Sequence, residues 1–352
     1  MSARPVVSVV IPAYNASRWI GATLCSVQCQ TLREIEIIVV DDGSVDDTPG
    51  IVERFAIHDP RIRVVYRQNG GVGAARNTGI RSARGEFIAP LDADDLWEPG
   101  KLEKQVSRIR QCGEKTAMIY CWSRQIDEGG NSSYCYPAFM IEGDFLSAII
   151  LRNFLGNASV PLLRAEALAT TGFYLTKAEQ GGVQGCEDWD LSIRISEHWQ
   201  VGLVPEVLVS YRQVRSCMSS ETGGMSASYR LVLERARQRN NHLPEALFRW
   251  SEGHFQSYLV SKSYGSRDFK GCLAAVSRSI AADPVVLLNW HLHSLMIKSV
   301  IWLAAGDWLK KAFKRREKSF ETGSSVSSPS ASVTLFERIQ QRRWTQVVDE
   351  KS

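Results

Sequence analysis

The chain has 352 residues, of which 44% are hydrophobic and 23% are charged, and its formal net charge is +4. This is the composition of an ordinary soluble globular protein with a substantial core, and so small a charge excludes any argument for nucleic acid as a partner. The length favours one large domain with an appendage, or two domains. The eight cysteines show no metal-binding spacing. Since no signal peptide stands at the N-terminus, we interpret them as reduced, mostly buried thiols of a cytoplasmic protein.

Four apolar, β-branched runs alternate with helical patterns in the first third of the chain. Strands are predicted at 6–11, 35–40, 62–66 and 86–91, and helices around 19–27, 48–57 and 73–83. Such unbroken apolar runs are typical of parallel strands that helices cover on both faces. Pro12 is expected to end the first strand, and Asn15 or Ser17 to cap the helix that follows. The pattern predicts an α/β fold, in which ligands bind outside the carboxyl ends of the strands.

The remainder of the chain changes from mixed to helical character. Strands are predicted at 117–122 and 201–209, and helices at 145–151, 189–197, 229–240, 244–264 and 269–282. A Ser-rich stretch at 319–332 is typical of a flexible linker, and 333–348 is either a short helix or disordered. We therefore expect three parts, which are an α/β domain over 1–222, a helical region over 223–317 and a flexible tail over 318–352.

Residues 285–305 form the most apolar stretch of the chain. Four polar residues inside it make a membrane span costly, namely Asn289, His291, His293 and Lys298. The stretch is rich in tryptophan, and six cationic residues follow it between 310 and 318. This pattern predicts a helix that lies on an anionic membrane surface, with contact through residues 285–316. A helix that packs on its own domain and has a solvated basic end is the alternative.

Three carboxylates follow the last of the four predicted strands directly, at Asp92, Asp94 and Asp95. Several negative charges at one edge of a sheet are unfavourable unless a cation sits among them. The spacing of Asp92 and Asp94 suits Mg²⁺ or Mn²⁺, held by one or two carboxylates while phosphate oxygens complete the coordination. Taken alone, however, an Asp-rich loop is more often a solvated turn.

Two further loops carry polar groups to the same edge of the predicted sheet. Asp41 and Asp42 end the second strand, and we expect Asp41 to accept a hydrogen bond from a base N–H or a ribose hydroxyl. One acid at 46–47 is expected only to cap the next helix. The loop 69–77 combines glycines, which let backbone approach a ligand, with Arg76, which could meet phosphate or ribose. No dinucleotide-binding glycine motif follows the first strand, which disfavours a nicotinamide-dependent enzyme.

Together, these loops closely resemble glycosyltransferase family 2, a large family of inverting enzymes that share the GT-A fold. The resemblance covers about the first 220 residues and rests on segments in the family's order, which are Val9–Asn15, Val39–Ser44, Ala74–Gly79, Gly85–Ile88 and Leu91–Asp95 with Pro99. It implies a Rossmann-like mixed sheet flanked by helices, with a helical C-terminal extension. It also implies transfer of a sugar from a nucleotide diphosphate donor, often UDP, with inversion at the anomeric carbon.

The resemblance implies roles for individual residues as well. Asp41 would contact the nucleotide base, Asp92 the ribose, and Asp94 the Mg²⁺ or Mn²⁺ that bridges the diphosphate, with Asp92 as a second metal ligand. The nucleotide-binding residues that it implies are Pro12, Tyr14, Asn15, Asp41, Asp42, Asn69, Arg76 and Asp92. The acceptor would be a hydroxyl of a saccharide or lipid-linked saccharide, in cell-surface glycan synthesis at the inner face of the cytoplasmic membrane.

An acid pair stands before a predicted helix at Glu187 and Asp188. Transfer to a hydroxyl needs a base that removes the proton, and a carboxylate within hydrogen-bond reach contributes about 10²–10⁴ in rate. The family resemblance makes Asp188 that base, with Glu187 beside it to bind or tune. The alternative is that both are first-turn acids favoured by the helix dipole. The loops 153–161 and 176–185 correspond to acceptor-side elements of the family.

One position departs from the family pattern. Relatives often carry a histidine after the segment that aligns with Tyr211 and Arg212, where this chain has Val214. Valine cannot ligate a metal or phosphate, so either Arg215 contacts the diphosphate or the loop works differently. Two other functions stay open. A nucleotidyltransferase would want a basic, Gly-rich loop after the first strand, which is missing here, and an inactive relative would only bind a sugar nucleotide or a partner.

Overall fold

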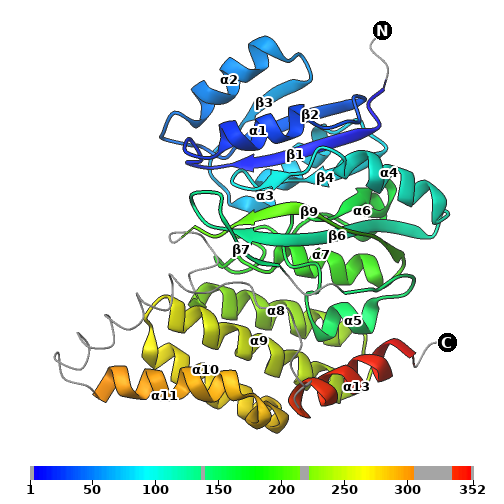
Figure 1. Cartoon of the computed structure of the whole chain (residues 1–352). Helices are drawn as coiled ribbons and strands as arrows, with labels where there is room; N and C mark the ends of the chain where they lie inside the picture. Colours follow the sequence, from blue (N-terminus) through cyan, green and yellow to red (C-terminus); the bar gives the residue numbers. More distant parts are fainter. Residues whose placement is uncertain (1–3, 136–138, 215–221, 305–334, 350–352) are drawn as a thin grey trace. The chain divides into compact units, whose positions relative to one another are not determined.

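The computed structural model describes residues 4–135, 139–214, 222–304 and 335–349 (Figure 1). Contacts between residues divide the chain into two compact units, 1–241 and 242–352. Helix α8 (Thr222–Arg239) belongs to the first unit, where the Tyr229 ring lies 5.3 Å from the Trp189 ring. The boundary expected from the sequence at residue 222 placed this helix in the C-terminal region instead.

The first unit is built on one mixed sheet. Its strands are β1 (Val7–Ala13), β2 (Ile35–Asp41), β3 (Ile62–Tyr66), β4 (Phe87–Pro90), β5 (Leu96–Trp97), β6 (Thr116–Ile126), β7 (Ser132–Cys135), β8 (Leu162–Arg164) and β9 (Gln200–Arg212). Over the described residues they form a nine-stranded sheet in the order β3-β2-β1-β4-β8-β6-β9-β5, with β7 paired to β6 (Figure 1). The α/β sheet expected from the sequence is thereby confirmed.

The first four strands of this order are parallel, and they bring three loops to one edge. Val10 in β1 pairs with Ile38 in β2 on one side and with Pro90 in β4 on the other. Every residue of β1, β2 and β4 is buried, as expected of strands covered on both faces. Since β8 runs antiparallel to β4, the loop 153–161 that precedes β8 reaches the same edge as the acids after β2 and β4.

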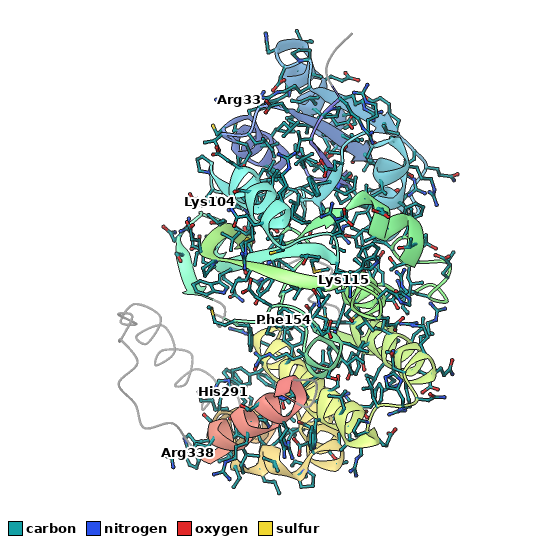
Figure 2. All side chains as sticks on the ribbon, turned by 90° about the vertical axis from the view of Figure 1, so that its right-hand side faces the viewer. Arg33, Lys104, Lys115, Phe154, His291 and Arg338 are labelled. Carbon is teal, nitrogen blue, oxygen red and sulfur yellow. The ribbon has the colours of Figure 1, made fainter. Side chains whose placement is uncertain are left out.

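Helices flank the sheet of the first unit. They are α1 (Ile20–Gln28), α2 (Thr48–His58), α3 (Val72–Ser82), α4 (Lys101–Gln111), α5 (Leu146–Leu151), α6 (Ala165–Thr171), α7 (Glu187–Ser196) and α8. Helix α3 packs on β1 and β2, where a Cβ at Gly79 would come within 2.4 Å of Val10, whereas α4 packs on β6 and β9. Charged side chains such as Arg33, Lys104 and Lys115 lie at the surface of the unit (Figure 2).

Two expectations about the start of the chain were wrong. Strand β1 continues through Pro12, which pairs with Val40 of β2. The backbone of Pro12 faces the side of β1 where pairing with β4 has already ended at Val10, so its missing N–H interrupts no hydrogen bond of the sheet. Helix α1 has Trp19 as N-cap without a side-chain cap, because Asn15 instead accepts the backbone N–H of Val45 at 2.9 Å.

The second unit is helical. It contains α9 (Glu245–Gly265), α10 (Phe269–Ala282), the 3₁₀ helix η2 (Pro284–Leu288), α11 (Trp290–Ala304) and α13 (Leu335–Asp349). Arg343 of α13 forms an ion pair with buried Asp283 and lies 4.5 Å over the Trp250 ring. Residues 335–349, which fall in the tail expected at 318–352, are therefore helical and packed on their own unit.

The apolar stretch 285–305 is divided rather than continuous. Helix η2 ends at Leu288, Asn289 separates it from α11, and residue 305 begins a segment outside the described residues. In the part of the chain that the structure covers, no helix has the length and apolar character needed to cross a membrane.

Candidate active site

The acidic loop after β4 is held by hydrogen bonds from two other elements. Ser159, just before β8, accepts the Asp92 N–H at 3.0 Å and donates its hydroxyl to Asp95 Oδ2 at 2.6 Å. Arg212, the last residue of β9, donates its backbone N–H to Asp95 Oδ1 at 2.9 Å and its Nε–H to the Asp94 backbone oxygen at 2.9 Å. Asp95 is fully buried by these contacts. It therefore supports the loop, while Asp92 and Asp94 face the site.

Asp94 is the carboxylate of this loop that fits a metal ion best. Burial raises the pKa of Asp94 to about 6, and the nearby Asp92 carboxylate adds to the rise. Among the described residues, only its own backbone N–H donates to the Asp94 carboxylate. No three His, Cys, Asp or Glu side chains of the described segments could enclose a metal by themselves. The donor set thus fits a divalent cation whose remaining ligands are water or phosphate oxygens.

Arg76 of α3 lies buried between two carboxylates from distant parts of the chain. Its Nη2 is 2.6 Å from Asp92 Oδ1 and its Nη1 is 2.9 Å from Glu187 Oε1. Burial alone would lower the pKa of Arg76, but the Asp92 and Glu187 carboxylates raise it above its usual value. This Asp92–Arg76–Glu187 triad joins the acidic loop, α3 and the start of α7. From the sequence, Arg76 was expected to meet phosphate or ribose instead.

Asp188 lies beside the triad without forming part of it. Its Oδ1 accepts the Trp189 backbone N–H at 2.8 Å, and no other described residue donates to its carboxylate. Burial raises the pKa of Asp188 to about 7, with the Glu187 carboxylate adding to the rise and Arg76 opposing it. Both Glu187 oxygens are engaged, because Gly185 donates its N–H to Oε2 at 3.0 Å. Of the two acids, Asp188 is the one with an oxygen available to a ligand.

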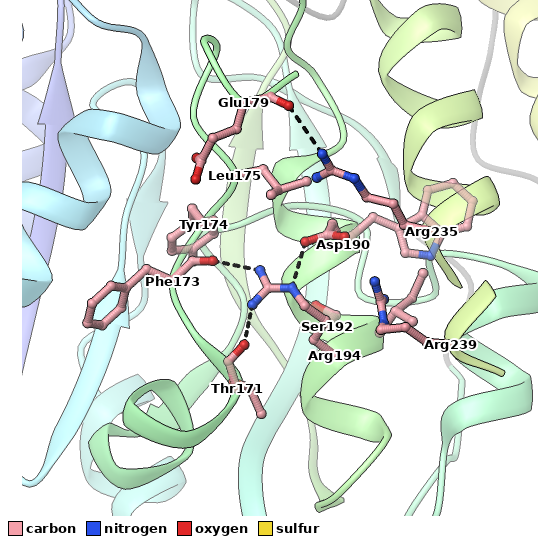
Figure 3. Close-up of polar contacts among 12 residues, drawn as sticks. Thr171, Phe173, Tyr174, Leu175, Glu179, Asp190, Ser192, Arg194, Arg235 and Arg239 are labelled. Atoms are coloured by element: carbon pink, nitrogen blue, oxygen red, sulfur yellow. Dashed lines mark hydrogen bonds and ion pairs between the residues drawn. The ribbon is translucent and has the colours of Figure 1, made fainter. Parts of the chain in front are cut away.

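The chain before α7 is anchored by two polar side chains. Asn77 of α3 donates to the Tyr174 backbone oxygen at 2.8 Å and accepts the Tyr174 N–H at 2.9 Å. Arg194 of α7 donates to Asp190 at 2.7 Å and to the two backbone oxygens of 171 and 173 at 2.6 Å each (Figure 3). These contacts fix the path of the chain that leads to Glu187 and Asp188.

The loops after β2 and β3 are joined by one carboxylate. Asp42 accepts the backbone N–H groups of Gly70 at 3.1 Å and of Gly71 at 2.8 Å, so its carboxylate holds these loops together. The adjacent Asp41 accepts the Ser44 N–H at 3.2 Å, but its Oδ1 is buried without a hydrogen-bond partner in the segments that the structure describes. A buried acceptor without a donor is unfavourable, and a donor group of a ligand would satisfy it. The geometry therefore favours Asp41 over Asp42 for a ligand contact.

The other expected nucleotide-binding residues differ in the exposure of their side chains to solvent. Pro12 is buried in β1, whereas the Tyr14 side chain is 53% exposed at the end of that strand. Asn15 is engaged with Val45, and Asn69 donates its side-chain amide to the Asp42 backbone oxygen at 3.0 Å. Their side chains thus shape the loops as well as border the site.

Several supporting residues were not identified from the sequence. Ser159, Asn77 and Arg212 each hold a loop of the site, yet single hydroxyl, amide and guanidinium groups carry no local signal of such a role. Only the position of Asn77 next to Arg76 in a family motif pointed to it. Val214 follows β9 as expected, but Arg215 lies outside the described residues, so its contact with a diphosphate stays a prediction.

Residues 8–142, which lie in the first unit, match the sequence family described as Glycosyl transferase family 2. It is 32% identical over 196 residues to a chondroitin synthase from Escherichia coli, which covers 55% of this chain and 27% of that protein. It is 40% identical over 129 residues to the putative glycosyltransferase EpsH of Bacillus subtilis, covering 36% of this chain and 37% of EpsH. The chain therefore spans well under half the length of these curated relatives.

Solved structures share the fold. TarS of S. aureus, residues 1–349 in complex with UDP-GlcNAc, superposes with a TM-score of 0.61 at 18% identity, covering 91% of this chain and 93% of that 1–349 chain. The mannosyltransferase PcManGT from Pyrobaculum calidifontis, in complex with GDP-Man and Mn²⁺, gives a TM-score of 0.54 at 19% identity, covering 86% of each chain. The expected GT-A fold with a helical C-terminal region is confirmed by these likenesses.

Proposed function

We propose that this protein is a metal-dependent, inverting glycosyltransferase. It would move a sugar from a nucleotide diphosphate donor, a UDP-sugar, to a hydroxyl of a saccharide or lipid-linked acceptor in cell-surface glycan synthesis. The observation that carries the proposal is the position of Asp188, a carboxylate with an available oxygen, next to the triad that joins Arg76 to Asp92 and Glu187. The complexes of TarS with UDP-GlcNAc and of PcManGT with GDP-Man support the donor class.

The donor would bind at the carboxyl edge of the parallel strands. The buried, unpaired Oδ1 of Asp41 can accept an N–H of the nucleotide base. Asp92 keeps one oxygen for the ribose or metal, because only Oδ1 is engaged by Arg76. The exposed ring of Tyr14 lies at the end of β1, at the same edge of the sheet. These groups come from three adjacent strands, as expected of a ligand outside the ends of an α/β sheet.

Asp188 would act as the base on the acceptor side. The acceptor oxygen attacks the anomeric carbon from the face opposite the diphosphate, so one displacement forms the new C–O bond, breaks the old one and inverts the configuration. Asp188 takes the proton of the acceptor hydroxyl on its available oxygen. Its pKa of about 7 suits this role at neutral pH, since a base must be ionised yet retain affinity for a proton. Glu187 cannot replace it, because both of its oxygens are engaged.

Asp94 would hold Mg²⁺ or Mn²⁺, with Asp92 beside it. When bound, the cation would neutralise charge on the departing diphosphate and replace a general acid at the leaving group. Asp94 is the stronger candidate of the two, because the Asp92 carboxylate shares its charge with Arg76. The presence of Mn²⁺ in the PcManGT complex supports a metal of this kind.

Replacing Asp94 with alanine is expected to weaken binding of the preferred nucleotide sugar in the presence of Mn²⁺ by about tenfold or more, because the metal ligand is lost. In the absence of metal, the wild type and Asp94→Ala are expected to bind the donor with similar, weak affinity. Calorimetry with a panel of UDP- and GDP-sugars, with and without Mn²⁺, measures both effects and identifies the donor.

The matched control is Asp47→Ala, which removes a carboxylate that is 64% exposed. This variant is expected to bind as the wild type does. If folded wild-type protein binds no nucleotide sugar, the proposed function is wrong, and the alternative that this protein is an inactive relative is favoured. If Asp94→Ala keeps the full effect of Mn²⁺, the metal assignment is wrong while the donor site stands.

We also propose that the second unit contacts an anionic membrane surface, which would bring the protein to a lipid-linked acceptor. Six large apolar side chains of η2 and α11 are between 44% and 77% exposed, and they are Leu287, Leu288, Trp290, Ile297, Val300 and Leu303. The cationic run at 310–318 follows them in the sequence. Exposed apolar and aromatic residues next to basic ones are typical of peripheral binding to anionic lipid.

The full chain is expected to bind vesicles that contain anionic lipid and to bind neutral vesicles at least about tenfold more weakly. The double variant Trp290→Ser/Ile297→Ser should reduce that binding by about tenfold, because two apolar side chains no longer enter the lipid. Ile57→Ser, at an apolar residue of α2 that is 78% exposed, is the control. Vesicle cosedimentation measures all three, and equal binding by the double variant and the wild type would contradict the proposal.

A further inference from the structure

A small cavity lies beside Asp188. Its polar lining residues are Asn153, Asn157, Tyr174, Asp188 and Ser192, and the other lining residues are apolar. About 10 Å³ of it is open to the centre of a water molecule. A single internal water occupies roughly 10–15 Å³, about the volume of one water-sized sphere, and it needs two to four polar partners. The cavity therefore has room for a water molecule.

Asn157 contributes an unused hydrogen-bond donor to this place. Only 6% of the residue is exposed, and its Oδ1 accepts the Ser159 backbone N–H at 3.0 Å. That bond assigns the Oδ1 and Nδ2 atoms of the amide, because a flipped side chain would point its Nδ2–H group at the Ser159 backbone N–H. The other end, Nδ2, is buried and has no partner among the described residues. A buried N–H group without an acceptor is unfavourable, so a ligand for it is expected.

Acceptors stand on the α7 side of the same cavity. The Asp188 carboxylate receives one hydrogen bond from the described residues, that from Trp189. Ser192 donates its hydroxyl to the Asp188 backbone oxygen at 2.8 Å, which leaves the lone pairs of Ser192 Oγ available. A water molecule can accept from the Asn157 amide and donate to the Asp188 carboxylate and to Ser192. These three partners satisfy the requirement for an internal water.

We propose that a water molecule in this cavity joins the Asn157 amide to the Asp188 carboxylate, and that Asn157 is a positioning residue for Asp188. The inference rests on the proposed role of Asp188 as base and adds a residue that sets its orientation. With one hydrogen bond from Trp189 and a second from the water, the carboxylate is fixed on two sides. Its remaining lone pairs then face the acceptor. Without the water, the carboxylate turns more freely and is less often in the reactive geometry.

The experiment compares two substitutions of Asn157. Asn157→Leu keeps the size and shape of the side chain but removes the amide, and it is expected to lower kcat for nucleotide-sugar hydrolysis by about tenfold. The KM for the donor should stay within about twofold, because the lost bond is to the Ser159 backbone N–H, whereas Ser159 holds Asp92 and Asp95 through its hydroxyl. Asn157→Ser keeps a hydroxyl donor and leaves space for water, so it should retain kcat within about threefold. Asn131→Leu, at an exposed amide in the turn before β7, is the control.

A crystal structure gives a readout that does not depend on activity. The wild type is expected to show a water within hydrogen-bond distance of Asn157 Nδ2 and of Asp188, and Asn157→Leu to lack it. The inference is overturned if the wild-type cavity is dry, or if Asn157→Leu keeps the wild-type kcat. It is also overturned if the loss of kcat comes with an equal rise in KM and a lower melting temperature, as for a merely structural role. A wild type that turns over no nucleotide sugar refutes the proposed function instead, and the crystal structure still decides on the water.

Discussion

Replacing Asp188 with asparagine is expected to lower kcat for nucleotide-sugar turnover by about 10³-fold while leaving donor binding unchanged. The amide keeps the shape of the carboxylate but cannot take the acceptor proton. The variant should be at least as stable as the wild type at pH 8. Burial raises the pKa of Asp188 to about 7, so the ionised carboxylate is less favourable in the folded chain than in the unfolded one. Release of the nucleotide and denaturant unfolding measure the two effects.

The pH dependence gives a second test of the same assignment. As the proposed base, Asp188 would act only after it has lost its proton, so kcat/KM of the wild type is expected to rise with pH around a midpoint near 7. In Asp188→Asn this rise should disappear. Asp47→Asn, at an exposed acid paired with Arg54, is the control and should keep both the rate and the profile. Full turnover by Asp188→Asn would remove the base assignment.

Replacing Arg76 with methionine is expected to lower the free energy of unfolding by about 3–5 kcal/mol. Arg76 is 3% exposed and pairs with Glu187, whose side chain is 5% exposed, so the variant leaves a buried carboxylate without its counter-charge. Asp92 would lose the same partner, and the site would lose the contact between the acidic loop and α7. We therefore expect turnover to fall together with stability. Urea unfolding monitored by tryptophan fluorescence measures the loss.

Two further variants separate the buried charge from the size of the side chain. Arg54→Met removes an arginine of similar length whose ion pair with Asp47 is exposed, and it should cost no more than about 1 kcal/mol. Arg76→Met/Glu187→Gln removes one uncompensated carboxylate and should recover part of the lost stability. If Arg76→Met is no more destabilising than Arg54→Met, the triad contributes no more to the free energy of unfolding than an exposed ion pair does.

The local sequence predicts where the site lies, because each acid follows a recognisable element. Asp92 and Asp94 follow an apolar strand, and parallel strands must end at a common edge of the sheet. The sequence cannot distinguish Asp41 from its neighbour Asp42. The difference depends on the backbone N–H groups of Gly70 and Gly71, which reach Asp42 only after β3 has paired with β2.

The same limit applies to contacts between distant residues. Glu187 and Asp188 are adjacent acids at the start of one helix. They differ because Glu187 pairs with Arg76, which lies 111 positions before Glu187 in the chain. The apolar stretch 285–305 shows a different limit, because its overall hydrophobicity does not reveal the break at Asn289 between η2 and α11. The pattern within one helix or strand can be predicted from composition and spacing. Which of two adjacent acids is left available to a ligand depends on long-range contacts.

One guanidinium group serves both halves of the candidate site, and this has a thermodynamic consequence. Asp92 on the donor side and Glu187 beside the proposed base share the charge of Arg76, so a ligand that draws Arg76 toward one carboxylate loosens its bond to the other. Linkage then requires that the donor alter the affinity for the acceptor by the same factor as the acceptor alters the affinity for the donor. The two substrates are thus expected to bind interdependently, through a single side chain that contacts carboxylates on both sides.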